Sequence, residues 1–133
     1  MARINFEQLH TDIIHAGEYG NTATATATLN VDGSSGDTVH FIRLPAHTRL
    51  LDLMVVHGAC GSGASASFGY MTENDTEATY FTGSKSLASA GRIRADSNHA
   101  PKVVEEVCDI IASLGAGVDG EITVVATYDW QGK

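Results

Sequence analysis

Apolar and polar residues alternate with a period of two along much of this chain. Residues 22 to 28 read Thr-Ala-Thr-Ala-Thr-Ala-Thr, and Leu29 and Val31 continue the alternation. Successive side chains of a strand point to opposite faces, so the segment is predicted to be a strand with threonines on one face and alanines on the other. The Asp, Gly and Ser residues at positions 32 to 37 predict a turn after it.

Three further segments before residue 72 also predict strands, and two of them are simple. Residues 38 to 44 are dense in Val39, Phe41 and Ile42, and Pro45 is expected to stop that strand. Residues 64 to 71 alternate small side chains up to Phe68 and Tyr70.

Residues 50 to 57 predict a strand that is apolar on both faces, which is typical of a buried central position. One side is expected to carry Leu51, Leu53 and Val55, and the other Leu50, Met54 and Val56. The glycine-rich stretch 58 to 63 predicts a flexible connection after it.

Residues 72 to 100 are rich in Thr, Ser, Gly, Asp and Asn and show no sustained period. We therefore expect long loops here, with a short helical turn and a brief strand near residues 92 to 95.

Residues 102 to 114 give two conflicting signals. Apolar residues recur at helical spacing, and Pro101 and Gly115 would bracket a helix well. A strand over 104 to 113 would instead turn through residues 115 to 120 and pair with the final segment as a hairpin. The final segment is a clear strand, with Ile122, Val124, Ala126 and Tyr128 on one face and Thr123, Val125, Thr127 and Asp129 on the other. We predict the strand for 104 to 113.

Six or seven strands without alternating helices predict an all-β fold, an antiparallel β-sandwich of jelly-roll type. Residues 22 to 133 form one sandwich domain in this prediction. Residues 1 to 21 form an N-terminal arm or short helix, which either packs on its own domain or reaches a neighbouring subunit. Its apolar residues are Ile4, Phe6, Leu9, Ile13 and Ile14.

Length and charge exclude several classes of protein and partner. With 133 residues, 43% of them hydrophobic and 18% charged, the chain fits a single domain. Lys and Arg total 8 against 16 Asp and Glu, a formal charge of -8, which argues against nucleic acid and anionic membrane as partners. The N-terminus lacks the apolar core of a signal peptide, so we expect the protein to fold in the cytoplasm where it is made.

No arrangement of chemically active residues matches a known catalytic or metal motif. The six histidines lack metal-ligand spacing, and His40 and His57 would converge as in cupin enzymes only if their strands were neighbours. The acidic residues 73 to 77 predict a solvated loop tip rather than a calcium loop. Glu105 and Glu106 would point to opposite faces of a strand. We therefore predict no catalytic residue, no metal and no cofactor.

Cysteines and aromatic residues each allow two interpretations. Cys60 and Cys108 either pair or, as their apolar neighbours favour, remain buried thiols. Tyr70, Tyr80, Phe81, Tyr128 and Trp130 either pack in the core and at its edges or form a sugar-stacking platform. The second interpretation would make the protein a carbohydrate-binding module, the alternative function.

The order of these segments resembles the small head-decoration, or cement, proteins of tailed bacteriophages. The resemblance spans about residues 22 to 130. Four parts of the sequence carry it: residues 36 to 46 together with 49 to 53, the strand end Phe68-Gly69-Tyr70, the pair Tyr80-Phe81, and residues 120 to 128. It implies a sandwich that binds the outside of the capsid as a dimer or trimer, has the major capsid protein as its partner, stabilises the head and performs no chemistry. The arm residues Ile4 to Ile14 would then supply capsid or subunit contacts.

Overall fold

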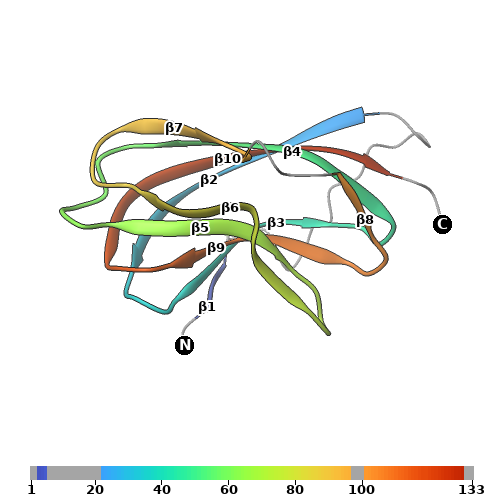
Figure 1. Ribbon diagram of the computed structural model, residues 1–133, viewed down its shortest axis with the longest axis horizontal. Coiled ribbons are helices and arrows are strands. Elements are labelled where there is room, and N and C mark those ends of the chain that lie inside the picture. Colours follow the sequence, from blue (N-terminus) through green and yellow to red (C-terminus); the bar gives the residue numbers. More distant parts are fainter. Residues whose placement is uncertain (1–2, 6–21, 97–100, 131–133) are drawn as a thin grey trace.

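The computed structural model describes residues 3–5, 22–96 and 101–130, and these form two packed β-sheets (Figure 1). Sheet A has the order β1-β3-β9-β5-β6, and sheet B the order β2-β10-β4-β7, with β8 also paired to β4. In sheet A the strands are β1 (Arg3–Asn5), β3 (Thr38–Leu44), β9 (Cys108–Leu114), β5 (Ser65–Met71) and β6 (Thr76–Ser86). In sheet B they are β2 (Thr22–Gly33), β10 (Val118–Trp130), β4 (Thr48–His57), β7 (Gly91–Arg94) and β8 (Lys102–Val104).

All described strand pairs are antiparallel except β1 with β3, which run parallel. The prediction of an all-β antiparallel sandwich is confirmed, and its form is compatible with a jelly roll. No helix is present in the described part of the chain, so the short helical turn expected between residues 72 and 100 is not found there.

The chain crosses between the sheets four times at one end, the left end in Figure 1. The crossings join β2 to β3, β4 to β5, β6 to β7 and β9 to β10. Backbone hydrogen bonds connect these turns to one another: Leu114 N–H donates to Asp37 O at 2.9 Å, and Leu87 N–H donates to Ala64 O at 2.8 Å. Gly36 has a φ of 90°, which favours glycine, in the turn from β2 to β3.

One core lies between the sheets because each strand directs alternate apolar side chains inward. Along β2, Ala25, Ala27 and Val31 are buried while the threonines are exposed, as predicted. Along β10 the buried residues are Ile122, Val124, Ala126 and Tyr128, again as predicted. The largest fully buried side chains include Tyr70, Tyr128, Phe41, Phe68 and Phe81, each of which contributes about 1.5–3 kcal/mol by leaving water.

The predicted faces of residues 50 to 57 were wrong in the first half of the strand. Register with β10 shifts between Thr127 and Tyr128, so that Leu51 is an extra residue in a bulge. The bulge turns Leu50 inward together with Leu53 and Val55. The strand is central in its sheet as predicted, but one face points outward, where Val56 is 38% exposed.

The prediction of loops over residues 72 to 100 missed strand β6. This strand lies at the edge of sheet A and alternates exposed polar residues with partly buried ones, so its sequence reads as loop. Its pairing with β5 also has two register shifts, and residues 78–81 bulge between Glu77 and Thr82. The short strand expected near residues 92 to 95 is confirmed as β7.

Choosing a strand over a helix for residues 104 to 113 was right, but the predicted hairpin was wrong. The segment contains two strands in different sheets, β8 and β9, which are separated by a turn at residues 105–107. Strand β9 pairs with β3 and β5, and β10 pairs with β2 and β4. Since β3 and β5 occupy both sides of β9, no side of β9 is left for β10, and the chain crosses to sheet B instead.

Candidate functional site

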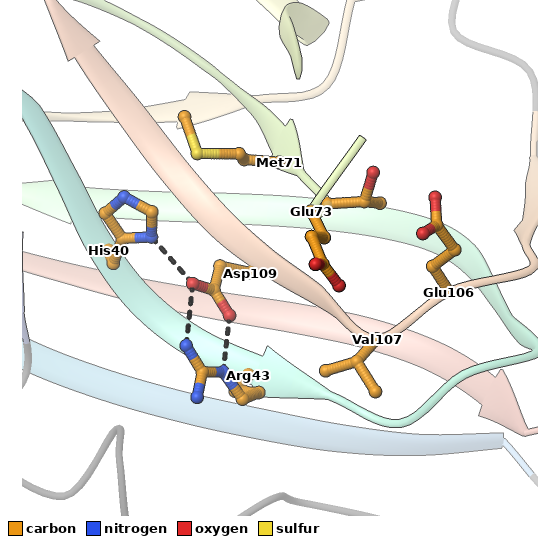
Figure 2. A pocket seen from close by; sticks show the side chains of 8 residues that line it. His40, Arg43, Met71, Glu73, Glu106, Val107 and Asp109 are labelled. Carbon is orange, nitrogen blue, oxygen red and sulfur yellow. Dashed lines mark hydrogen bonds and ion pairs between the residues drawn. The ribbon is translucent and has the colours of Figure 1, made fainter. Parts of the chain in front are cut away.

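Figure 2 shows a pocket of about 400 Å³. Its lining includes the β5–β6 and β8–β9 connections, which lie at the end of the sandwich opposite the four crossings. Strands β3 and β9, the end of β5 and the turn before β9 supply its lining. The lining residues are His40, Arg43, Met71, Thr72, Glu73, Glu106, Val107 and Asp109.

Asp109 is the charged centre of this pocket. Its position on β9 is directly opposite Arg43 on β3, so the two side chains share one face of sheet A. Arg43 donates two hydrogen bonds, from Nε to Oδ1 at 2.8 Å and from Nη2 to Oδ2 at 3.3 Å. His40 Nδ1 lies 2.7 Å from Asp109 Oδ2 and completes the group (Figure 2).

The ionised form of Asp109 is strongly favoured even though the residue is only 6% exposed. Burial is the largest single influence on its pKa and would raise it. The hydrogen bonds from His40 and Arg43, with the positive charge of Arg43, outweigh burial and lower the pKa of Asp109 to about 2. The hydrogen bond between Arg43 and Asp109 also raises the pKa of Arg43.

The rim of the pocket is acidic and partly apolar. Glu73 comes from the turn between β5 and β6, and Glu106 from the turn before β9, where it accepts a hydrogen bond from Asn74 Nδ2 at 2.6 Å. Val107 is 42% exposed beside them. A smaller pocket of about 160 Å³ adjoins this one and shares Thr72 and Glu106 with it.

The arrangement is suited to binding rather than to proton transfer. A carboxylate with a pKa near 2 that already has two partners is a weak base at neutral pH. Among the described residues, no group of three or more His, Cys, Asp and Glu side chains is placed to hold a metal ion. The pocket therefore offers the exposed carboxylate of Glu73 and the partly buried carboxylate of Glu106 beside an apolar surface, and these suit a cationic or hydrogen-bond-donating group.

The cupin-like pair does not form. His40 lies in sheet A and His57 in sheet B, because β3 and β4 are joined by a crossing between sheets and not by a hairpin. His57 Nδ1 instead lies 3.0 Å from the carbonyl oxygen of Gly58.

The two acidic segments have different outcomes. Residues 73–77 are all exposed, with 73–75 in the turn between β5 and β6 and Thr76 and Glu77 at the start of β6. The prediction of a solvated loop tip is confirmed for residues 73–75. Glu105 and Glu106 were wrongly placed on a strand, because both lie in the turn between β8 and β9. Glu105 Oε2 lies 2.9 Å from His47 Nδ1, while Glu106 lines the pocket.

Both cysteines are free thiols, as the apolar residues around them indicated. Cys60 and Cys108 are 1% and 0% exposed. Burial raises the pKa of Cys108 to about 12 and also raises the pKa of Cys60.

The aromatic residues belong mainly to the core. Tyr70, Phe81 and Tyr128 are at most 2% exposed, so they have no free face on which a sugar ring could stack. Tyr80 packs edge to face against Tyr70 and Phe81, with centroid distances of 5.2 and 4.9 Å. The predicted core role is confirmed for these three buried residues.

The predicted arm contacts lie almost entirely outside the described residues. Only Ile4 falls within them, and the backbone of β1 pairs with β3 of the same chain, with Ile4 opposite Val39. Phe6, Leu9, Ile13 and Ile14 lie outside.

Sequence reasoning missed the pairing of Arg43 with Asp109. The two residues are 66 positions apart, and neither belongs to a recognisable motif. Only the register between β3 and β9 brings them together.

Comparison with known proteins identifies the fold. No protein-family model and no curated protein sequence matches the chain. A chain in the capsid structure of Ralstonia phage GP4 is 16% identical and superposes with a TM-score of 0.80, covering 97% of this chain and 98% of that one.

Two further phage capsid structures contain the same fold. The Cyanophage Pam1 capsid asymmetric unit matches with a TM-score of 0.66 at 17% identity over 95% of this chain and 96% of that one. The acid-stable capsid structure of Helicobacter pylori bacteriophage KHP30 matches with a TM-score of 0.61 at 14% identity, over 86% and 91%. In the described part of this chain, no helix has the length and apolar character that a membrane crossing requires.

Proposed function

We propose that this chain is a structural protein of a phage virion that binds the outside of the capsid shell and stabilises it as a decoration, or cement, protein. The observation that carries the proposal is the match to a chain of the Ralstonia phage GP4 capsid, which has a TM-score of 0.80 and covers nearly all of both chains. A match over the full length of both chains means that the whole domain, and not one motif within a larger enzyme, is the shared unit.

The physical character of the molecule supports this role. A structural protein acts through the surface area that it buries against its neighbours, and it needs no reacting group. The pocket around Asp109 has an ionised, fully partnered carboxylate and no nucleophile beside it. The proposal therefore includes no catalysis, and its partners are the major capsid protein and further copies of this chain as a dimer or trimer.

Reconstitution tests the proposal directly. Purified chain is mixed with expanded shells assembled from the major capsid protein of the same phage, and bound protein is measured by co-sedimentation and located by electron cryomicroscopy. We expect saturable binding at fixed positions on the outer surface, and shells that resist heat better when decorated. Binding only to the inner surface, or none to expanded shells, would overturn the proposal.

The arm residues form a separate part of the proposal. A variant with Phe6, Leu9, Ile13 and Ile14 replaced by serine keeps the β1 segment, which pairs with β3. We expect weaker shell binding or a smaller oligomer than wild type, with the domain still folded. Unchanged binding together with unchanged oligomeric mass would exclude the arm as a contact surface.

A further inference from the structure

Strand β2 (Thr22–Gly33) lies at an edge of sheet B in the described part of the chain. It pairs with β10 along twelve residues, from Thr22 opposite Asp129 to Gly33 opposite Val118, and no described strand pairs with its other side. Alternate residues of a strand direct their N–H and C=O groups to opposite sides. About half of the residues in β2 therefore direct hydrogen-bonding groups away from β10.

The edges at β6 and β7 are protected in different ways. On β6, Asp96 N–H donates to Phe81 O at 2.9 Å and Gly83 N–H donates to Asp96 Oδ2 at 3.2 Å, so a neighbouring segment occupies its outer side at residues 81–83. Strand β7 has only four residues, two of them the exposed Arg92 and Arg94. Short length, charge and cover are the usual means by which proteins prevent pairing at an edge.

Among the described residues, strand β2 has none of these protections. It contains no proline, it carries no charge before Asp32, and its register with β10 is unbroken. In a chain with a formal charge of -8, a stretch of ten uncharged residues is a place where an identical chain can approach without repulsion. Long, flat and uncharged edges are the ones on which a further strand adds.

The repeat in β2 is also self-complementary. Thr22, Thr24, Thr26 and Thr28 are all exposed on the outer face, and the alanines face the core. A two-fold axis perpendicular to the sheet keeps the outer faces of both copies on one side, which places threonine opposite threonine and alanine opposite alanine. Cross-strand threonine pairs are favourable, and Thr28 Oγ1 already lies 2.9 Å from Thr123 Oγ1 on β10.

We propose that the free edge of β2 is the surface on which a second copy of this chain pairs, antiparallel and about a two-fold axis near Thr26, so that sheet B continues across both molecules. Pairing about a two-fold axis closes the assembly, because each copy uses its open edge once. The inference depends on β2 alone and does not require the proposed capsid function.

Disulfide trapping tests the pairing. Thr24→Cys, Thr26→Cys and Thr28→Cys are oxidised under native conditions, with the buried Cys60 and Cys108 kept in place. A residue on the two-fold axis meets its own copy at a distance that a disulfide can span. We expect a linked dimer to form fastest at one of these positions and more slowly at the next.

Thr127→Cys is the matched control. It lies on β10 directly opposite Thr24, on the same outer face but one strand in from the edge. We expect no linked dimer from this variant. Linkage of Thr127→Cys with none at the three β2 positions would show that copies meet on the face of the sheet, and would overturn pairing at the edge.

Hydrogen exchange on the wild-type chain gives a second measurement that needs no variant. As the concentration rises and sedimentation shows the mass of two copies, we expect every second amide of β2 to become protected. A chain that stays monomeric at all concentrations overturns the inference. Protection of the same amides in the monomer would also overturn it, because the edge would then be covered from within the chain.

The outcome is separable from that of the proposed function. A chain that decorates shells but remains monomeric in solution and unlinked on the shell removes the pairing and leaves the decoration role. A dimer linked through β2 that does not bind shells removes the decoration role and leaves the pairing.

Discussion

Asp109 shows how one side chain couples stability to pH. Its folded pKa of about 2 lies below the ordinary value of 3.8, so it stabilises the fold above pH 4, and this contribution is lost as the pH falls from about 4 toward 2. This difference between the folded and the ordinary pKa corresponds to about 2 kcal/mol in the free energy of unfolding.

We predict that Asp109→Asn lowers the free energy of unfolding by about 2 kcal/mol near neutral pH, because Arg43 and His40 lose their ionised partner. The difference from wild type should shrink as the pH falls below about 4. Urea denaturation across a pH series measures both effects, with Asp32→Asn as a control at an exposed position. A difference that stays constant down to pH 2 would contradict the assignment.

Gly69 marks a close approach between two backbones. A Cβ at this position would overlap the carbonyl oxygen of Glu77 and come within 2.7 Å of the carbonyl carbon of Ala78, because β6 bulges over β5 here. All three of the nearest atoms belong to the backbone of Glu77 and Ala78, so no side chain can move aside.

We predict that Gly69→Ala destabilises the protein by about 3 kcal/mol, because the β6 bulge must shift. Gly83→Ala is the matched control. Gly83 lies on β6 itself, and a Cβ there meets nothing within 4 Å. Its effect should stay within about 0.5 kcal/mol. Thermal melts of the two variants make the comparison, and equal melting temperatures would argue against the close approach.

At the scale of elements, the two-residue period of β10 sets which side chains carry the core. Val124 is fully buried, and Val125, the next residue, lies on the outer face and is partly exposed. We predict that Val124→Ala costs about 2 kcal/mol and Val125→Ala about 0.5 kcal/mol. Chemical denaturation of both variants checks this, and similar costs would mean that both faces of sheet B are buried.

Regular strands could be predicted well from the sequence, and irregular ones could not. The alternation in β2 and β10 determines both the strand and its faces, because half of each strand contacts water and half the core. In β4 and β6, bulges interrupt the alternation, so the sequence no longer shows which side chains face the core. A bulge depends on the partner strand, so local sequence carries little sign of it.

For the candidate site, the sequence indicated individual residues but not their grouping. The exposed acidic turn at residues 73–75 could be predicted because its composition is that of a loop. The pocket also needs Asp109, Arg43 and His40, which the pairing of β3 with β9 brings together.

At the scale of the whole molecule, the two thiols report on cooperative unfolding. Cys60 and Cys108 are both buried, and burial raises the pKa of each, so neither supplies reactive thiolate in the folded state. We predict that a thiol reagent labels neither residue in native protein and labels both together across the urea transition. Mass spectrometry counts the labels, and labelling of Cys60 alone at low urea would show that the crossing end opens separately.

The sequence by itself determined the all-β sandwich class, the faces of β2 and β10, and the burial of both cysteines. These properties follow from local periodicity and from the free energy of removing apolar groups from water, and both act at each residue wherever its partners lie. The tertiary structure alone decided which strands pair, that β9 and β10 separate into opposite sheets, and that Asp109 meets Arg43. Strand pairing joins residues far apart in sequence, and its register depends on how all strands fit around one core.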